Sequence, residues 1–545
     1  MTDELLWVVD DRPSRRFPIY TRGNTGEVYP NVITPLCGSV VKGPIAEGQG
    51  RALTEMGAVV PRDLAERDRA VLTGCFGGYL YANLSIARLM GARTPGMAPE
   101  DVDVQMFGIS EAPPYRAQRG DRDLRATARL GRLMVRTVRG PSFAWLSSER
   151  AAVRRWAAAR PAVGSATEDE LLTTVDEGAA WLSDLMRSML LGGAYGGIAS
   201  AVVDRAAAKA DAEDRARAAA GVGGVESAGP AVELWRLARL DAGAFESAFG
   251  AFLQRYGARG PDEYELANDT WGTRPEIALA AVDRLRRAGG ADPAVTQARL
   301  ADERRAAVER VVAGTPAPAR PLVRRALRVV AEGAAGRELA KGTVIEALYA
   351  VRLALFELVR RAQDRGAPER WDCFLVTREE LPAFVARPAS FAEAIAERAE
   401  RRELLQGRTP PFVFEGTIPD PTSWPRREVP GAVPPAVPGE RLTGLGVSHG
   451  TATGTVRVIR DPSDPSALAP GDVLVAPITD PAWTPLFLVA EAVVVDVGAN
   501  MSHAAIVARE LGIPGVMSVH RATERLADGT RVRVDGTAGT VTVLP

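Results

Sequence analysis

His503 stands in the stretch GANMSHAAIVARELGIPG and is one of only three histidines in a chain of 545 residues. Ser502, directly before it, is a favourable helix N-cap, and Gly512 marks a helix end. A ring in the first turn of a helix lies beside free backbone N–H groups, which bind anions and lower the pKa of an imidazole. We therefore expect an exposed, neutral His503 that accepts a phosphoryl group transiently, or else a simple polar residue at a helix start.

A pair of cations is the second candidate for chemistry. Arg337 and Lys341 are four residues apart in the helical stretch GRELAKG, so their charges lie on one helical face. Two cations that converge on a transferring phosphoryl group would stabilise its charge. Only three of the 67 basic residues are lysine, so Lys341 stands out in a chain that otherwise uses arginine. The alternative is a solvated basic face with no part in the chemistry.

These residues lie in segments of different periodicity. Residues 62–406 carry apolar residues at three- and four-residue spacing, which indicates helices. The first 60 residues are broken by proline and glycine and are expected to be largely extended or irregular. Residues 410–438 hold nine prolines, so a semi-rigid connector is expected there.

Residues 439–545 alternate short β-branched stretches with two helical ones, over residues 484–492 and 502–512. This pattern predicts a compact α/β domain. The expected fold class is therefore multidomain α+β. A mainly helical domain over residues 1–409 is followed by the proline-rich connector and then by the α/β domain.

Four ordered blocks in the last hundred residues resemble the swivelling phosphohistidine domain of the phosphoenolpyruvate-utilising enzyme family. The blocks are GLGVSHGTATGTVRVI, GDVLVAPITDPAWTPLF, GANMSHAAIVARELGIPGV and LADGTRVRVDGTAGTV. The third block matches the signature GGxxSHxAIxARExGIPAV, with alanine at the second glycine. The resemblance implies that His503 carries the phosphoryl group and that four nearby residues bind or support it, namely Ser502, Gly498, Asn500 and Thr484.

The front of the chain resembles the acceptor-binding middle region of rifampicin phosphotransferases. The similarity rests on YTRGNTGEVYPNVITPL, FLQRYGARGPDEYEL, GRELAKG and PERWDCFLVTREEL, which occur in the same order. It implies that Arg337 and Lys341 act at the acceptor site. Asn24 and Glu27 would either bind an acceptor hydroxyl or cap the irregular entry segment. Arg259 would be either a structural ion-pair residue or a substrate contact.

The composition argues against several classes of function. A net charge of −1 is unsuited to nucleic-acid binding, which needs a basic surplus. No apolar run reaches 18 residues and the chain start does not resemble a signal peptide, so no membrane contact and a cytoplasmic location are expected. Three widely separated cysteines predict neither a disulfide framework nor a zinc site, and no metal ligands are expected.

The resemblance implies a phosphotransferase component of the dikinase type. Neither an ATP-grasp domain nor a phosphoenolpyruvate-binding barrel is recognisable, so a separate ATP-grasp or phosphoenolpyruvate-dependent protein is expected to load His503. ATP and Mg²⁺ would belong to that donor, with no cofactor assigned to this chain. The acceptor would be a small-molecule hydroxyl of open identity. Two alternatives remain: a biosynthetic enzyme that activates a carboxylate or drives a condensation with the same relay, and a non-catalytic binding protein.

Overall fold

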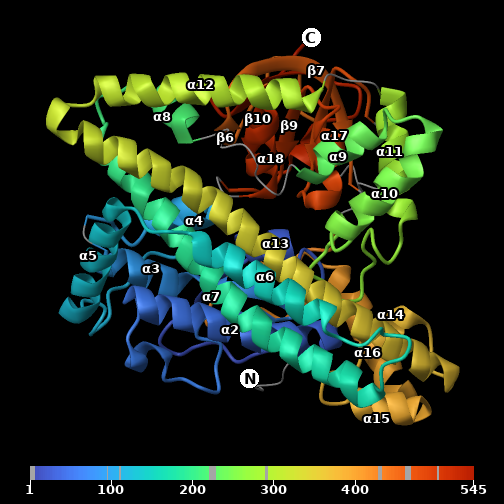
Figure 1. Cartoon of the computed structure of the whole chain (residues 1–545). Coiled ribbons are helices and arrows are strands. Elements are labelled where there is room, and N and C mark those ends of the chain that lie inside the picture. Colours follow the sequence, from blue (N-terminus) through green and yellow to red (C-terminus); the bar gives the residue numbers. More distant parts are fainter. Residues whose placement is uncertain are drawn as a thin grey trace.

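A computed structural model shows two packed bodies, a mainly helical front body and a C-terminal α/β domain (Figure 1). It describes residues 6–94, 96–109, 112–219, 229–288, 292–427, 433–460, 468–499 and 502–545. The multidomain α+β fold expected from the sequence is therefore confirmed.

The front body contains α1 (Thr25–Val28), α2 (Pro35–Met56), α3 (Leu84–Arg93), α4 (Asp101–Phe107), α5 (Leu124–Arg139), α6 (Ala144–Ala158), α7 (Glu168–Ala206), α8 (Ala212–Ala219), α9 (Gly229–Leu237), α10 (Ala242–Tyr256), α11 (Glu276–Ala288), α12 (Pro293–Gly314), α13 (Arg320–Asp364), α14 (Arg370–Cys373), α15 (Leu381–Ala386) and α16 (Ala392–Gln406). Short 3-10 turns are η1 (Pro61–Leu64), η2 (Ala317–Ala319), η3 (Pro388–Phe391) and η4 (Pro421–Ser423).

Two long helices, α7 and α13, lie against each other and form the spine of the front body (Figure 1). A capping box of Thr167 and Glu170 starts α7 by satisfying two free backbone N–H groups. Glycine allows the two helices to approach closely, because a Cβ on Gly333 would lie 2.8 Å from a Cα of α7. Since α13 also carries Arg337 and Lys341, this packing fixes both cations on a rigid element.

Helix α2 corrects the expectation that the first 60 residues are largely irregular. Thr34 caps its start by accepting a hydrogen bond from the backbone N–H of Cys37 at 3.3 Å, and Pro35 fits the first helical position. A Cβ on Gly48 would lie 2.2 Å from the backbone oxygen of Ser183 in α7, so this glycine serves close packing. Burial against α7 outweighs the low helix propensity of the glycines.

A four-stranded antiparallel sheet, in the order β2-β3-β1-β4, completes the front body. Its strands are β1 (Ile19–Thr21), β2 (Thr73–Phe76), β3 (Tyr79–Asn83) and β4 (Val413–Glu415). β4 comes from the expected connector and pairs with β1 at the sheet edge, where proline-rich sequence is tolerated. Trp424 is buried in the same body. The first half of residues 410–438 is therefore part of the front body, and residues 428–432 lie outside the described part.

The C-terminal domain holds an eight-stranded mixed sheet in the order β5-β12-β11-β7-β8-β9-β10-β6. Its elements are β5 (Arg441–Thr443), β6 (Leu445–Ser448), β7 (Thr451–Val458), β8 (Asp472–Ala476), η5 (Pro481–Trp483), α17 (Thr484–Phe487), β9 (Ala492–Val495), α18 (His503–Leu511), β10 (Gly515–Met517), α19 (Ala522–Arg525), β11 (Arg531–Asp535) and β12 (Thr540–Val543). Strands β7 to β10 are parallel neighbours. α17 ends earlier than the helix expected over residues 484–492, because the chain turns there toward β9.

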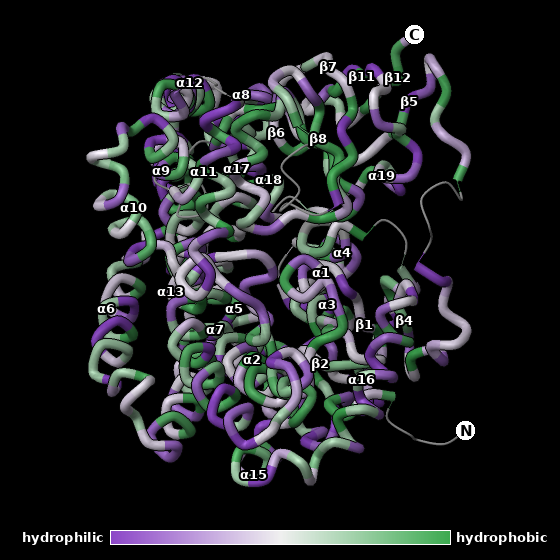
Figure 2. The backbone as a smooth tube through the Cα atoms, turned by 90° about the vertical axis from the view of Figure 1, so that its right-hand side faces the viewer, coloured by the Kyte–Doolittle hydropathy of each residue, from purple (hydrophilic) through white to green (hydrophobic). Residues whose placement is uncertain are grey.

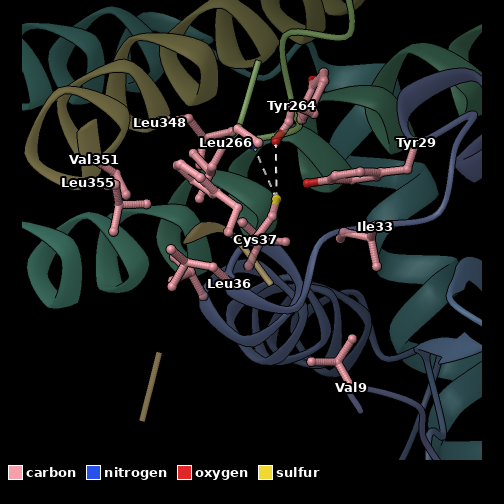
Figure 3. Packing of buried hydrophobic residues seen from close by; sticks show 14 of the residues in the cluster. Val9, Tyr29, Ile33, Leu36, Cys37, Tyr264, Leu266, Leu348, Val351 and Leu355 are labelled. Carbon is pink, nitrogen blue, oxygen red and sulfur yellow. Dashed lines mark hydrogen bonds between the residues drawn. The ribbon is translucent and has the colours of Figure 1, made fainter. Parts of the chain in front are cut away.

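Cys37 of α2 lies in the core of the front body (Figure 3). Its Sγ is 3.5 Å from the backbone oxygen of Tyr264 and 3.5 Å from the backbone nitrogen of Leu266. Leu348 and Leu355 of α13 belong to the same cluster of buried side chains. The segment after α10 is thereby held between α2 and α13, which fixes the position of its charged residues.

The C-terminal domain lies on the front body, with α12 along one side and α9 to α11 on the other (Figure 1). Figure 2 shows α1 and α4 beneath α18. Val489 is buried in one apolar cluster with Leu234 and Trp271 of the front body. A Cβ on Gly512 would lie 3.2 Å from the side chain of Leu300 in α12. These contacts place the C-terminal domain against the front body, and a Cβ on Gly108 would lie 3.4 Å from the Cβ of Ala499 in the turn before α18.

Candidate active site

His503 is the first residue of α18, and the caps of this helix are those expected from the sequence. The side chain of Ser502 accepts a hydrogen bond from the backbone N–H of Ala505 at 3.2 Å. Gly512 ends the helix in the left-handed conformation, with φ of 66°. The local prediction of a capped helix that begins at His503 is confirmed.

The imidazole of His503 lies between two threonine hydroxyls. Thr479 Oγ1 is 3.1 Å from Nδ1, and Thr484 Oγ1 is 3.3 Å from Nε2. The ring of Phe487 meets the imidazole edge-on, with centroids 6.2 Å apart. A neutral ring can satisfy both hydroxyls, because it accepts at one nitrogen and donates at the other. Thr484 was expected near the site. Thr479 lies in the same sequence block, but it was not predicted to be a site residue.

The structure corrects the expectation that His503 is exposed, since only 6% of the residue is accessible. Its pKa is lowered well below 6.5, first by burial and then by the positive charges of Lys341 and Arg259. The neutral form of His503, which was expected from its place at the helix start, is thus favoured mainly by burial. A neutral imidazole has a free lone pair and is the form that attacks phosphorus.

Glu27 of α1 brings a carboxylate to the N-terminus of α18. The backbone N–H groups of Ala499 and His503 act to lower the pKa of this half-buried carboxylate. Burial raises the pKa of Glu27 to about 7, while the charges of Lys341 and Arg337 oppose the rise. The anion site expected at this helix start therefore receives a carboxylate from the front body.

Arg337 and Lys341 of α13 reach the same place from another element. Both charges act on Glu27, and Lys341 also lowers the pKa of His503. Both residues are half-buried. The fold therefore brings the charge of Lys341 to the histidine, and Arg337 acts on Glu27, although these residues are far apart in the sequence.

Arg259 forms a buried ion pair with Glu263, whose N–O distance is 2.8 Å. The two side chains are 6% and 1% exposed, so the pair is shielded from water. This geometry favours the structural interpretation of Arg259. Its charge still reaches the site, because it lowers the pKa of His503.

The remaining expected residues have mainly structural contacts. Asn24 donates a hydrogen bond from Nδ2 to the backbone oxygen of Met106 at 2.7 Å and has a positive φ of 63°. Asn24 precedes α1, but its side chain makes no cap hydrogen bond there and instead ties this segment to α4. Gly498 accepts a hydrogen bond from Ser518 Oγ at 2.7 Å, which holds the turn before α18. Asn500 lies outside the described residues.

Asp480 joins the two bodies beside the site and was missed by the motif analysis. Its Oδ2 accepts a hydrogen bond from the backbone N–H of Asp262 at 2.9 Å, and its Oδ1 accepts one from Ala482 at 2.8 Å. Burial and the nearby charge of Asp262 raise the pKa of Asp480. Asp480 belongs to the TDP turn of the second sequence block, so the sequence did contain a signal for it. Its partner Asp262, however, cannot be read from the sequence.

Charge at the site comes from side chains of the protein. Within the described ranges, no group of three or more His, Cys, Asp or Glu residues could hold a metal ion.

Two known protein families match segments of the chain that contain residues of this site. Residues 468–539 match the mobile domain of PEP-utilising enzymes, and this segment contains His503. Residues 239–338 match the fourth domain of rifampicin phosphotransferase, and this segment contains Arg259 and Arg337. Within the C-terminal domain, the chain is thus similar to the mobile domain of PEP-utilising enzymes. More specifically, its front body resembles rifampicin phosphotransferase, as the motifs predicted.

Several relatives are similar over much of the chain. An uncharacterized protein of Mycobacterium tuberculosis is 29% identical over 97% of this chain and 62% of its own length. Rifampicin phosphotransferase of Streptomyces sviceus is 32% identical over 54% of this chain and 34% of its own. Prodigiosin synthesizing transferase of Serratia marcescens is 31% identical over 55% of this chain and 33% of its own. The chain thus spans less than two thirds of each of these relatives.

Other comparisons add little to this picture. Among solved structures, aconitase X of Thermococcus kodakaraensis matches 20% of the chain with 25% identity and a TM-score of 0.17, which establishes no shared fold. None of the helices in the described part of the chain has both the length and the apolar character needed to cross a membrane.

Proposed function

We propose that the protein is a phosphotransferase component in which His503 accepts a phosphoryl group and passes it to a small-molecule hydroxyl. The observation that carries this proposal is the arrangement around the ring. The charge of Lys341 of the front body lowers the pKa of the buried imidazole on the C-terminal domain, and Lys341 and Arg337 both act on the carboxylate of Glu27. Cations that converge on a transferring phosphoryl group stabilise its charge.

The phosphoryl group would come from a separate ATP-grasp protein, with a phosphoenolpyruvate-dependent donor as the alternative. Because His503 is buried against the front body, loading requires the C-terminal domain to move away. The proline-rich segment before β5 suits such a swivel, since proline-rich linkers act as semi-rigid spacers. ATP and Mg²⁺ would be bound by the donor. The docked arrangement would then be the one that delivers the phosphoryl group to an acceptor held by the front body.

The test mixes the full chain with γ- or β-labelled ATP and a candidate ATP-grasp protein. The expected result is a phosphoprotein whose label is stable to alkali and lost in acid, as a phosphohistidine is. His503→Ala should carry no label, whereas His520→Ala, which changes an exposed histidine of the same domain, should be labelled normally. Equal labelling of His503→Ala and the unmodified chain would overturn the proposal.

A second candidate is a condensing enzyme that uses the same relay to activate a carboxylate. The observation in its favour is the similarity to the prodigiosin synthesizing transferase. Identification of the product separates the two functions, because a phosphotransferase leaves a stable phosphate ester. A condensing enzyme instead releases inorganic phosphate together with a ligated molecule.

A further inference from the structure

Helix α5 carries a row of arginines on its outer side. They are exposed and follow one another at alternating spacings of four and three residues, namely Arg125, Arg129, Arg132, Arg136 and Arg139. At 3.6 residues per turn this spacing places them in an arc of about 80°, along about 21 Å of helix. The other side of α5, with Ala126 and Leu130, is buried in the front body. These five arginines therefore form a straight basic stripe that faces solvent.

The basic stripe has no carboxylate partner in the part of the chain that the structure describes. Asp123, next to it in the sequence, caps α5 by accepting the backbone N–H of Arg125 at 3.0 Å and is itself held by Arg62. Exposed arginines of other helices are paired, as Arg310 of α12 is with Asp214. Like charges three and four residues apart repel one another on a helix, so an acidic partner would stabilise this surface.

Helix α16 carries the opposite charge at the same spacing. Glu393, Glu397 and Glu400 are exposed and lie four and three residues apart, and the exposed Leu404 continues the row by four more. The three carboxylates fall in an arc of about 60°. Among the described residues, none of them forms an ion pair. Because Ile395 on the other side is buried, α16 presents these glutamates to solvent as an acidic stripe.

The two stripes cannot meet within one chain, because α5 and α16 lie on opposite sides of the front body (Figure 1). A second copy of the chain can place its α16 along α5. Rows of side chains spaced by three and four residues are those through which two helices pack side by side. Leu124 and Val135 border the basic stripe and are 89% and 52% exposed, so they offer an apolar contact to Leu404 of the other copy.

The surroundings of α5 favour a protein partner over a membrane or a nucleic acid. A helix that binds a membrane surface inserts its apolar side into the lipid, and the apolar side of α5 is already buried in the front body. A nucleic acid offers phosphates to the arginines, but the net charge of −1 does not favour such binding. The exposed apolar residues beside the stripe suit a protein helix better than a phosphate backbone.

We propose that copies of the chain associate through α5 of one copy and α16 of the next, with the acidic stripe lying along the basic stripe. This inference does not depend on the proposed phosphoryl transfer. The contact joins two different surfaces, so it is heterologous and leaves each outer copy with one unused stripe. A single exposed ion pair contributes little, so the association needs several pairs at once and weakens when salt screens them.

The test measures the mass of the full chain by sedimentation velocity over a dilution series. The expected result is self-association that is at least about 10-fold weaker at about 500 mM salt than at about 50 mM salt. Arg531→Glu with Arg533→Glu reverses two exposed arginines of the C-terminal domain and is the matched control, which should associate as the unmodified chain does.

Two charge-reversal variants identify the surfaces. Arg129→Glu with Arg132→Glu disrupts the basic stripe, and Glu397→Arg with Glu400→Arg disrupts the acidic stripe. Each variant alone should be monomeric, because its two stripes no longer match. An equimolar mixture should associate again, since the first variant keeps an intact α16 and the second an intact α5. Thermal unfolding shows that each variant is folded, and the recovery in the mixture excludes misfolding as the cause of the loss.

Several results would overturn the proposal. One is an unmodified chain that stays monomeric at low salt over the whole dilution series. Another is self-association of either charge-reversal variant at the strength of the control, and a third is a mixture of folded variants that stays monomeric. Binding of polyuridylate RNA or of anionic lipid vesicles to the α5 arginines of a monomeric chain would assign this surface to another class of partner.

Discussion

The backbone N–H of Asp262 donates a hydrogen bond to Oδ2 of Asp480 at 2.9 Å, and this contact ties the front body to the C-terminal domain beside the active site. Asn31 donates a hydrogen bond to the side chain of Asp262 at 3.1 Å, so the front-body side of the junction is itself anchored. The two carboxylates lie close enough for the charge of Asp262 to raise the pKa of Asp480. We therefore expect docking of the two bodies to depend on the protonation of Asp480.

We expect Asp480→Asn to strengthen docking at pH 8. The docked domain holds the proton of Asp480 more tightly than an undocked domain would, so docking weakens as the pH rises above the usual range of an aspartate. An asparagine cannot ionise, and its one amide oxygen can still accept the N–H of Asp262, while the hydrogen bond from Ala482 is lost. Hydrogen exchange of residues 502–511 should be slower in the variant at pH 8, with a smaller difference at pH 5. Glu491→Gln, at an exposed position of the same domain, is the control. Exchange that is equal or faster in Asp480→Asn at pH 8 would refute the coupling.

Lys341→Met should raise the pKa of His503. The positive charge of Lys341 is the second cause of the lowered pKa, after burial, so the pKa should move up but stay below 6.5. Nitrogen NMR of the ring is practical, because the chain has only three histidines and His520 provides an exposed internal reference. An unchanged His503 titration in this variant would mean that Lys341 does not face the ring in solution.

Removal of Arg259 should destabilise the fold. Arg259→Met leaves Glu263 buried without its ion-pair partner, which typically costs about 3–5 kcal/mol in the free energy of unfolding. The double variant Arg259→Met with Glu263→Leu should recover much of this loss, because both charges are gone. Denaturant unfolding measures the three free energies. A stable single variant that fails only in phosphoryl transfer would favour the substrate-contact interpretation of Arg259 instead.

Two glycines of α2 provide a matched test of helix packing. A Cβ on Gly48 would lie 2.2 Å from a backbone oxygen of α7, so Gly48→Ala should lower the free energy of unfolding by about 1–3 kcal/mol. Nothing lies within 4 Å of a Cβ on Gly43, so Gly43→Ala should be neutral or stabilise the protein by up to about 1 kcal/mol. If both variants unfold alike, α2 does not pack against α7 as the structure shows.

Local sequence patterns predicted the elements around the histidine well. The Ser502 cap, the glycine end of α18 and the β-branched strands of the C-terminal domain follow from backbone preferences that act within a few residues. The same patterns failed for α2, because glycine and proline were taken as helix breakers. There the contact with α7 decides the outcome, and such a contact has no signature in the α2 sequence alone.

The sequence by itself determined which side chains are candidates for chemistry: the histidine at a helix start and the two cations on one face of a helix. Only the tertiary structure decided how they act together. It buries His503, places Thr479 and Thr484 at its ring nitrogens, and brings Glu27 to the start of its helix. The physical reason is that burial and charge shift a pKa through groups that are close in space. Periodicity and motif spacing describe only groups that are close along the chain.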